Sequence, residues 1–359
     1  MCNPKSLLRF PVLALISAAL FLSGCIKPKS EQKTATLLQA SDATRADLYK
    51  QVNYLAQVDS MRAKMDLIFE DNSYAEFGSS DLYRSADGDI VVQRPASIRL
   101  KVEVPIIGTD VATMTSDGMN FRVAIHQDGG SGKNKKFILG SNGADYSILQ
   151  KRVKQIVSKD PKKLQKTVNA FANLRPQHFT DALLVRPVDT QKYTYLVSTF
   201  VQEEVDFKKY KKKNPLGWVL RSFYLLDEFE KDPNGGMVIR RRFWFDRVGG
   251  ALLSRQQIFG GDGEIESDIV YGKRGATTEE GSVYLPLEVQ VTRPKEKYKM
   301  TLKYQAPSKV KIGKRFPPKA FLLENEWGLE VLDLDKKLTE VRNGAIDNAN
   351  PIIDTSTQN

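Results

Sequence analysis

The chain has 359 residues, of which 41% are hydrophobic and 27% charged, and 54 Lys and Arg against 43 Asp and Glu give a net charge of +11. This composition is that of a globular protein, and it excludes collagenous, disordered and polytopic membrane proteins. A basic surface attracts nucleic acids and anionic lipid headgroups by the same Coulomb force, so charge alone leaves both partner classes open.

Cysteine and histidine are scarce and poorly placed for chemistry. Both cysteines, Cys2 and Cys25, lie in the first 25 residues, and His126 and His178 are the two imidazoles of the chain. A Cys/His zinc site needs four clustered ligands, so none can be assembled from the body of the chain. Neither histidine lies in a nucleophile motif such as G-x-S-x-G. We therefore expect a protein that is not an enzyme and that uses no metal or other cofactor.

The N-terminal residues have the pattern of a secretion signal. Lys5 and Arg9 form a basic start, and an apolar run of 13 residues follows them. This run is too short to cross a bilayer as a helix, which takes about 20 residues. Leu22-Ser23-Gly24-Cys25 resembles the lipobox of bacterial lipoproteins, in which the signal is cut before the cysteine. We expect residues 1–24 to be removed and Cys25 to carry an S-diacylglycerol and an N-acyl chain such as palmitate.

Lipidation would place the protein on a membrane, because three acyl chains anchor far more firmly than the single chain of a myristoylated protein. Ile26, rather than Asp, follows the cysteine, which favours the outer membrane, with the protein facing the periplasm. Cleavage removes Lys5 and Arg9 but no acidic residue, so the net charge falls from +11 to +9. In the periplasm we expect this charge to meet an anionic membrane surface and no nucleic acid.

The mature chain is predicted to begin with a tether and a helix. Residues 25–40 are the lipidated cysteine followed by polar sequence without a period, which is typical of a flexible linker. Ser41 or Asp42 is predicted to cap a helix that ends near Val58. Its apolar face has helical spacing and consists of Leu48, Val52 and Leu55.

Alternation of apolar and polar residues then predicts strands. Ala63, Met65, Leu67 and Phe69 fall on one face of the first of them. Turn signals at Asp87-Gly88 and Asp117-Gly118 indicate an antiparallel meander. The further strands are expected at 73–84, 89–93, 97–104, 110–116, 120–126 and 133–140.

The period becomes helical in an insert at 147–182, and strands resume after it. They are expected at 193–205, 218–230, 237–247, 250–259, 264–272, 283–292 and 297–305, with a last one at 320–323 or 329–333. We predict one domain over residues 41–335 and a polar, disordered tail at 336–359. Long antiparallel runs around a few helices indicate an α+β fold, in which a strongly curved antiparallel sheet, an incomplete β-barrel, is covered by the helices.

A series of short motifs resembles a family of periplasmic proteins. Arg94-Pro95 ends one strand, Pro105-Ile106-Ile107-Gly108 follows the next, and Ser116-Asp117-Gly118 forms a later turn. Tyr284-Leu285-Pro286 begins a strand in the second half. In this order the motifs resemble the lipoprotein carrier LolA and its outer-membrane receptor LolB. The resemblance extends over roughly residues 41–335, but each motif is short and weak by itself.

The resemblance implies a half-barrel whose concave face, covered by helices, holds the acyl chains of a lipoprotein. Such a face suits a hydrocarbon guest because apolar burial is non-directional and scales with area. The same alternating residues are equally expected in a closed core filled by its own side chains. The pattern of apolar residues does not distinguish these two alternatives.

Two positions acquire roles from the resemblance. Arg94 matches the carrier's arginine that hydrogen-bonds the covering helices, although an exposed cation at a strand end is the commoner role of such a residue. Ile106 and Ile107 match the receptor's apolar tip, which inserts cargo into the membrane; the alternative is a tip folded back on the core. The chain has two isoleucines where the receptor has one leucine.

Three basic runs are candidates for contact with anionic headgroups. They are Lys133, Lys135 and Lys136; Lys208, Lys209, Lys211, Lys212 and Lys213; and Arg240, Arg241 and Arg242. Most such runs are solvated surface, and the alternative is docking to a membrane. The second run is the headgroup contact that we predict.

The sequence therefore predicts a lipid-anchored periplasmic protein that binds lipid or lipoprotein acyl chains and delivers them to the outer membrane, with a soluble periplasmic carrier as a further partner. The alternative is an envelope-stress sensor or a protein-interaction scaffold on the same fold, without transfer activity. A hydrolase is disfavoured, since neighbouring acids such as Asp227 and Glu228 point to opposite faces of a strand.

Overall fold

The computed structural model describes residues 35–71, 81–104, 109–127, 132, 135–146, 149, 177–206, 217–278 and 283–343. The chain divides into two compact units, of which the smaller comprises Met1–Leu37 and Glu203–Leu220. In this unit β1 (Thr36–Leu37) pairs in parallel with Val219 and Leu220. The larger unit comprises Leu38–Gln202 and Arg221–Asn359.

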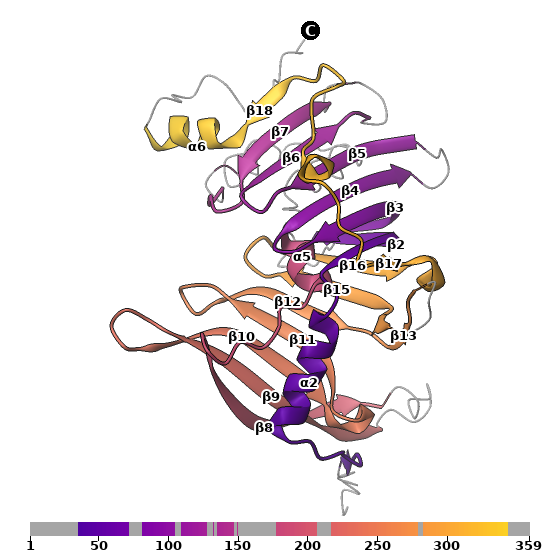
Figure 1. Ribbon diagram of the computed structural model, residues 1–359, viewed down its shortest axis with the longest axis vertical. Coiled ribbons are helices and arrows are strands. Elements are labelled where there is room, and N and C mark those ends of the chain that lie inside the picture. Colours follow the sequence, from indigo (N-terminus) through magenta and orange to yellow (C-terminus); the bar gives the residue numbers. More distant parts are fainter. Residues whose placement is uncertain are drawn as a thin grey trace, which may run out of the picture. The chain divides into compact units, whose positions relative to one another are not determined.

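One curved, open sheet dominates the larger unit (Figure 1). Consecutive strands of this sheet, from β9 at one end to β7 at the other, pair antiparallel. β18 runs parallel to β7, as β1 does to β9. β8 (Thr194–Val205) also pairs with β9, β17 (Lys311–Ile312) pairs with β2, and β13 (Arg274–Ala276) pairs with β14 (Tyr284–Pro286). In spatial order the other strands are β9 (Trp218–Lys231), β10 (Met237–Asp246), β11 (Leu252–Phe259), β12 (Ile265–Tyr271), β15 (Glu288–Arg293), β16 (Tyr298–Tyr304), β2 (Ser60–Asp71), β3 (Asp81–Gln93), β4 (Ser97–Val104), β5 (Thr109–Ser116), β6 (Asn120–Ile125), β7 (Lys136–Ser141) and β18 (Val331–Asp333).

Helices cover the apolar face of this sheet. α2 (Arg45–Ala56) packs on β11, and α5 (Gln177–Leu183) packs on β3, β4 and β15. A third helix, α6 (Leu334–Arg342), packs on β7. The architecture confirms the predicted α+β fold with a curved, incomplete barrel.

α2 forms where the spacing predicted a helix, but its cap lies further along the chain. Thr44, not Ser41 or Asp42, is the N-cap, and it forms a capping box with Asp47. This box satisfies two backbone N–H groups of the first turn, so the chain enters the helix at this point. The predicted apolar face, Leu48, Val52 and Leu55, is buried.

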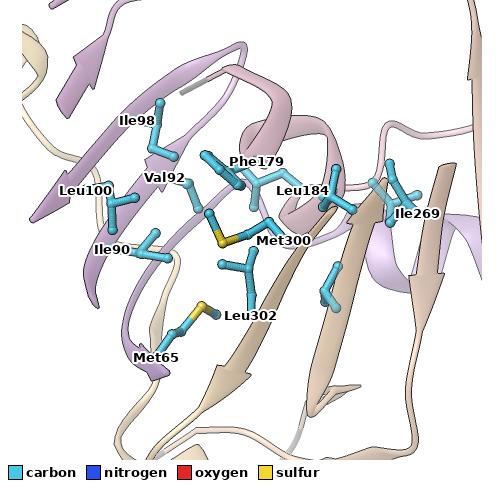
Figure 2. Packing of buried hydrophobic residues seen from close by; sticks show 14 of the residues in the cluster. Met65, Ile90, Val92, Ile98, Leu100, Phe179, Leu184, Ile269, Met300 and Leu302 are labelled. Carbon is cyan, nitrogen blue, oxygen red and sulfur yellow. The ribbon is translucent and has the colours of Figure 1, made fainter. Parts of the chain in front are cut away.

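The alternation predicted for the first strand is also observed. In β2 the side chains of Ala63, Met65, Leu67 and Phe69 are buried and belong to one core cluster. Across the ladder Leu67 faces Leu302 and Phe69 faces Met300. Buried side chains of the neighbouring strands join the same cluster, part of which Figure 2 shows.

The Asp87-Gly88 turn is a wrong prediction. β3 passes through both residues without interruption, and Gly88 faces Met65 on one side and Val102 on the other. A Cβ at Gly88 would lie 2.8 Å from Leu67 Cδ1. Glycine is therefore present because the neighbouring side chain closes over the backbone, not because the chain reverses.

The C-terminal part differs from the expectation as well. The last strand is at 331–333, the second of the two predicted positions, but α6 begins directly after it. The tail predicted from residue 336 thus begins inside a helix, whose Leu338 and Val341 are buried. Its N-terminal Asp335 accepts a 2.6 Å hydrogen bond from Ser141 Oγ, which fixes the helix on β7.

Candidate functional site

The candidate site is the part of the concave face that lies beneath α5. Phe179 and Ala182 of the helix are buried, as are Leu184 and Val185 directly after it. Figure 2 shows Phe179 close to Val92 and Met300 of the sheet. Side chains of the chain itself thus fill this face under α5. An acyl guest can occupy it only if α5 moves away.

Arg94 holds this cover in place. It follows β3, and its Nη2 donates to the carbonyl of Val185, after α5, and to that of Ala56, the last residue of α2, at 3.4 Å. Burial lowers the pKa of the Arg94 guanidinium. One half-buried cation therefore joins the C-terminal ends of both helices to the same point of the sheet.

A second arginine holds the residues that follow. Arg241 of β10 is buried and donates to the carbonyls of Arg186 at 3.0 Å and Pro187 at 3.2 Å. It also forms a two-point ion pair with Glu228 of β9, whose exposed fraction is 0%. Burial opposes the charge on Arg241, but the hydrogen bonds and charge of Glu228 raise its pKa.

The same network reaches α2. The Tyr195 hydroxyl donates to Glu228 at 2.6 Å and accepts from the Asp189 amide at 3.0 Å. The Val188 amide donates to Asn53 Oδ1 on α2 at 3.0 Å. The segment 185–189 is consequently fixed by polar contacts to strands and to α2. α5 itself is held by apolar packing and by a buried 2.9 Å hydrogen bond between His178 Nδ1 and the hydroxyl of Tyr298 on β16.

The structure contradicts one of the predictions for the basic runs. Arg241 is buried and is therefore neither solvated surface nor a docking cation, whereas Arg240 and Arg242 are partly exposed; each of the three forms an ion pair with β9. Their partners are Glu230, Glu228 and Asp227. The sequence does contain a pattern that predicts these ion pairs, because the acids and the arginines lie on two consecutive strands that form one hairpin. The three arginines considered without the preceding strand do not reveal the pairs.

Most of the other predicted site residues lie outside the described part of the chain. These are Cys25, Ile106, Ile107 and the run Lys208, Lys209, Lys211, Lys212 and Lys213, and most of the predicted insert at 147–182. Arg94 is described, and it is brought together with the helix ends rather than with any of these residues.

Cations do gather on the outer face of the sheet. A cavity of about 410 Å³ is lined by residues of β2 and of the stretch after β16. Arg62 is paired there with Asp89 at 2.7 Å. The exposed lysines of this cavity are Lys64, Lys309 and Lys311.

The described residues form neither a metal-binding cluster nor a membrane-spanning helix. Within them, no three His, Cys, Asp or Glu side chains are grouped so that they could hold a metal ion. No helix formed by these residues has both the length and the apolar character needed to cross a membrane.

The chain is similar to several solved structures at low sequence identity. One of them is a LolA superfamily protein. It comes from Nitrosomonas europaea and is 10% identical, with a TM-score of 0.39; the match covers 79% of this chain and 99% of that one. A protein of the DUF1329 family from Desulfovibrio piger is 10% identical over 79% of this chain and 97% of that one, with a TM-score of 0.41.

A third similar structure is a domain from Vibrio parahaemolyticus described as an outer membrane lipoprotein-sorting protein. It is 10% identical over 76% of this chain and 94% of that one, with a TM-score of 0.36. No family model matches the sequence, and no curated protein does.

Proposed function

We propose that this protein is a non-enzymatic, lipid-anchored envelope protein that takes up acyl chains on the concave face of its half-barrel and delivers them to the outer membrane. The observation that carries the proposal is the double hydrogen bond of Arg94 to the ends of α2 and α5. It fastens the C-terminal ends of both helices to the sheet, next to the contacts of Arg241 with the segment after α5 and of His178 with Tyr298. These polar contacts can open without unfolding the sheet.

The free energies make such an exchange feasible. Exposing Phe179 and Leu184 costs about 1.5–3 kcal/mol each, and breaking hydrogen bonds of a charged group adds about 1.5–3 kcal/mol. Burying a 16-carbon chain returns about 0.8 kcal/mol per methylene, roughly 11 kcal/mol in all. A long acyl chain can therefore displace the cover, and a short one cannot.

The remaining parts of the proposal concern the membrane. Cys25 is proposed as the acylated anchor, Ile106 and Ile107 as the apolar tip that enters the bilayer, and Lys208 to Lys213 as a contact with anionic headgroups. The lysines around the outer cavity, Lys64, Lys309 and Lys311, add cations to the surface that would face those headgroups.

The test uses residues 26–359, which contain every contact described above, and a fluorescent 16-carbon acyl probe. Arg94→Leu removes the fastening and should make the probe bind about 10-fold more tightly, because less free energy is needed to open the cover. Arg99→Leu is the matched control. It removes an arginine from the outward-facing side of β4, between the buried Ile98 and Leu100, and should leave the affinity unchanged.

Two results would decide against the proposal. If the wild-type chain binds no acyl probe and native mass spectrometry finds no co-purified lipid, transfer is excluded and the sensor or scaffold alternative is favoured. If the probe binds but Arg94→Leu and Arg99→Leu behave alike, Arg94 does not fasten the cover.

A further inference from the structure

A further arginine, Arg274, lies beside α2 and has no ion-pair partner among the described residues. Arg274 lies in β13, and its Nη1 donates to Oε1 of Gln51 on α2 at 3.1 Å. Its Nε and Nη2 atoms are shielded from solvent, yet no acceptor among the described residues is in hydrogen-bonding range of either. Burial lowers the pKa of Arg274, and the one side chain bonded to it is neutral.

The arrangement of the unpaired donors is informative. Nε and Nη2 form one edge of the planar guanidinium, the edge on which a carboxylate or phosphate binds through two parallel hydrogen bonds. The buried Arg241, by contrast, uses the same edge, Nε and Nη2, on the carboxylate of Glu228. Burying these two N–H donors without acceptors costs folding free energy, and a bound anion would supply the missing acceptors.

The residues around Nε and Nη2 of Arg274 connect these donors with the apolar concave face that is proposed to bind the acyl chain. Tyr271, at the end of β12 and three residues before Arg274, belongs to the apolar core cluster. Its hydroxyl is also buried without a hydrogen-bond partner among the described residues. The unpaired donors thus lie beside α2, next to the end of a strand whose Tyr271 belongs to the apolar core.

We infer that Arg274 binds the anionic group, a carboxylate or a phosphate, of the ligand whose acyl chain lies under the helices. This inference rests on the proposed function and narrows it. The lipidated cysteine of a lipoprotein carries neutral ester and amide groups, whereas fatty acids and phospholipids carry an anion. The ligand class is therefore an anionic lipid.

The test compares ligands that share the 16-carbon acyl chain and differ in whether they carry an anionic group, again with residues 26–359. Palmitate is paired with methyl palmitate, and palmitoyl lysophosphatidate with monopalmitoylglycerol, each displacing the fluorescent acyl probe. We expect the acid of each pair to bind about 10-fold or more tightly than its neutral counterpart, as for a charged hydrogen-bonded pair. The pair with the larger preference identifies the carboxylate or the phosphate as the ligand group.

Variants test whether Arg274 causes the preference for the acid over the neutral ligand. Arg274→Gln should abolish this preference by weakening binding of the acid, with binding of the neutral ligand unaffected. Arg99→Gln removes the same charge from the outer face and should retain the preference. Since Arg274→Gln could disturb folding, Gln51→Glu provides a second route: a carboxylate beside Nη1 neutralises the arginine and should also abolish the preference, whereas Gln51→Leu should not.

Equal binding of acid and neutral ligand by the wild-type chain would overturn this inference and leave the proposed function standing. Retention of the preference by Arg274→Gln would overturn it as well. Binding of neither ligand would refute the proposed function and this inference together.

Discussion

The buried pair of Arg241 and Glu228 permits a sharp prediction about what holds the segment after α5. Arg241→Met keeps most of the side-chain volume but removes the guanidinium. Glu228 then remains as a fully buried carboxylate whose hydrogen bond from Tyr195, at 2.6 Å, is retained. The carbonyls of Arg186 and Pro187 lose their donor at the same time.

The expected loss of unfolding free energy is large. Removing one partner of a buried ion pair costs about 3–5 kcal/mol, because the remaining charge is uncompensated. Removing both charges, with Arg241→Met and Glu228→Leu together, should cost less, about 1–3 kcal/mol, since only hydrogen-bond partners are then lost. The double variant should therefore be more stable than the single one.

Two measurements check this reasoning. Urea unfolding followed by tryptophan fluorescence gives the free energies, and Trp244, on the strand that carries Arg241, reports on this region. Hydrogen exchange gives the local effect: the amides of Val188 and Asp189, which donate to Asn53 and Tyr195, should exchange faster in both variants. A loss below about 1 kcal/mol in the single variant, with unchanged exchange, would refute the role assigned to the pair.

Further predictions concern other parts of the fold. Burial lowers the pKa of His126, which stacks on Trp327 at 4.7 Å, so the unfolded chain binds a proton more readily than the folded one. The contribution of the neutral His126 to stability is therefore fully present above pH 6.5, the unperturbed pKa of histidine, and is lost as the pH falls through the lower pKa of the folded state. His126→Phe should flatten this part of the curve of unfolding free energy against pH, measured by urea unfolding. Gly88→Val should lower stability by about 1–3 kcal/mol through overpacking against Leu67, and Gly88→Ala by less; equal melting temperatures would contradict this. Thr44→Ala should cost about 1 kcal/mol through loss of the α2 cap, visible in the same melts, and Thr44→Ser should cost little.

The strands could be predicted because each buries one face and exposes the other. In β2 the alternation from Ala63 to Phe69 is strict, and a shift of one residue would expose the whole buried set, so the pattern fixes the register of the strand as well as its existence. The same holds for the apolar face of α2. These are local consequences of periodicity, and no knowledge of the neighbouring strand is needed to find them.

Where the prediction failed, a neighbour decided the outcome. Gly88 has the sequence signature of a turn, but the closeness of Leu67 is what requires glycine there. Arg241 belongs to a run that resembles a solvated patch, and only its pairing with β9 makes it a buried anchor. α6 is polar along most of its length, and its helical state depends on the contact with β7.

The sequence by itself determined that the chain has an apolar-faced sheet with few helices, and it singled out Arg94 through the order of short motifs. Those properties are encoded in spacing along the chain. Only the tertiary structure decided which carbonyls Arg94 contacts, that side chains of α5 fill the concave face, and that Arg274 keeps one edge unpaired. Each of these depends on residues that are far apart in the chain but close in space, and periodicity carries no information about such distances.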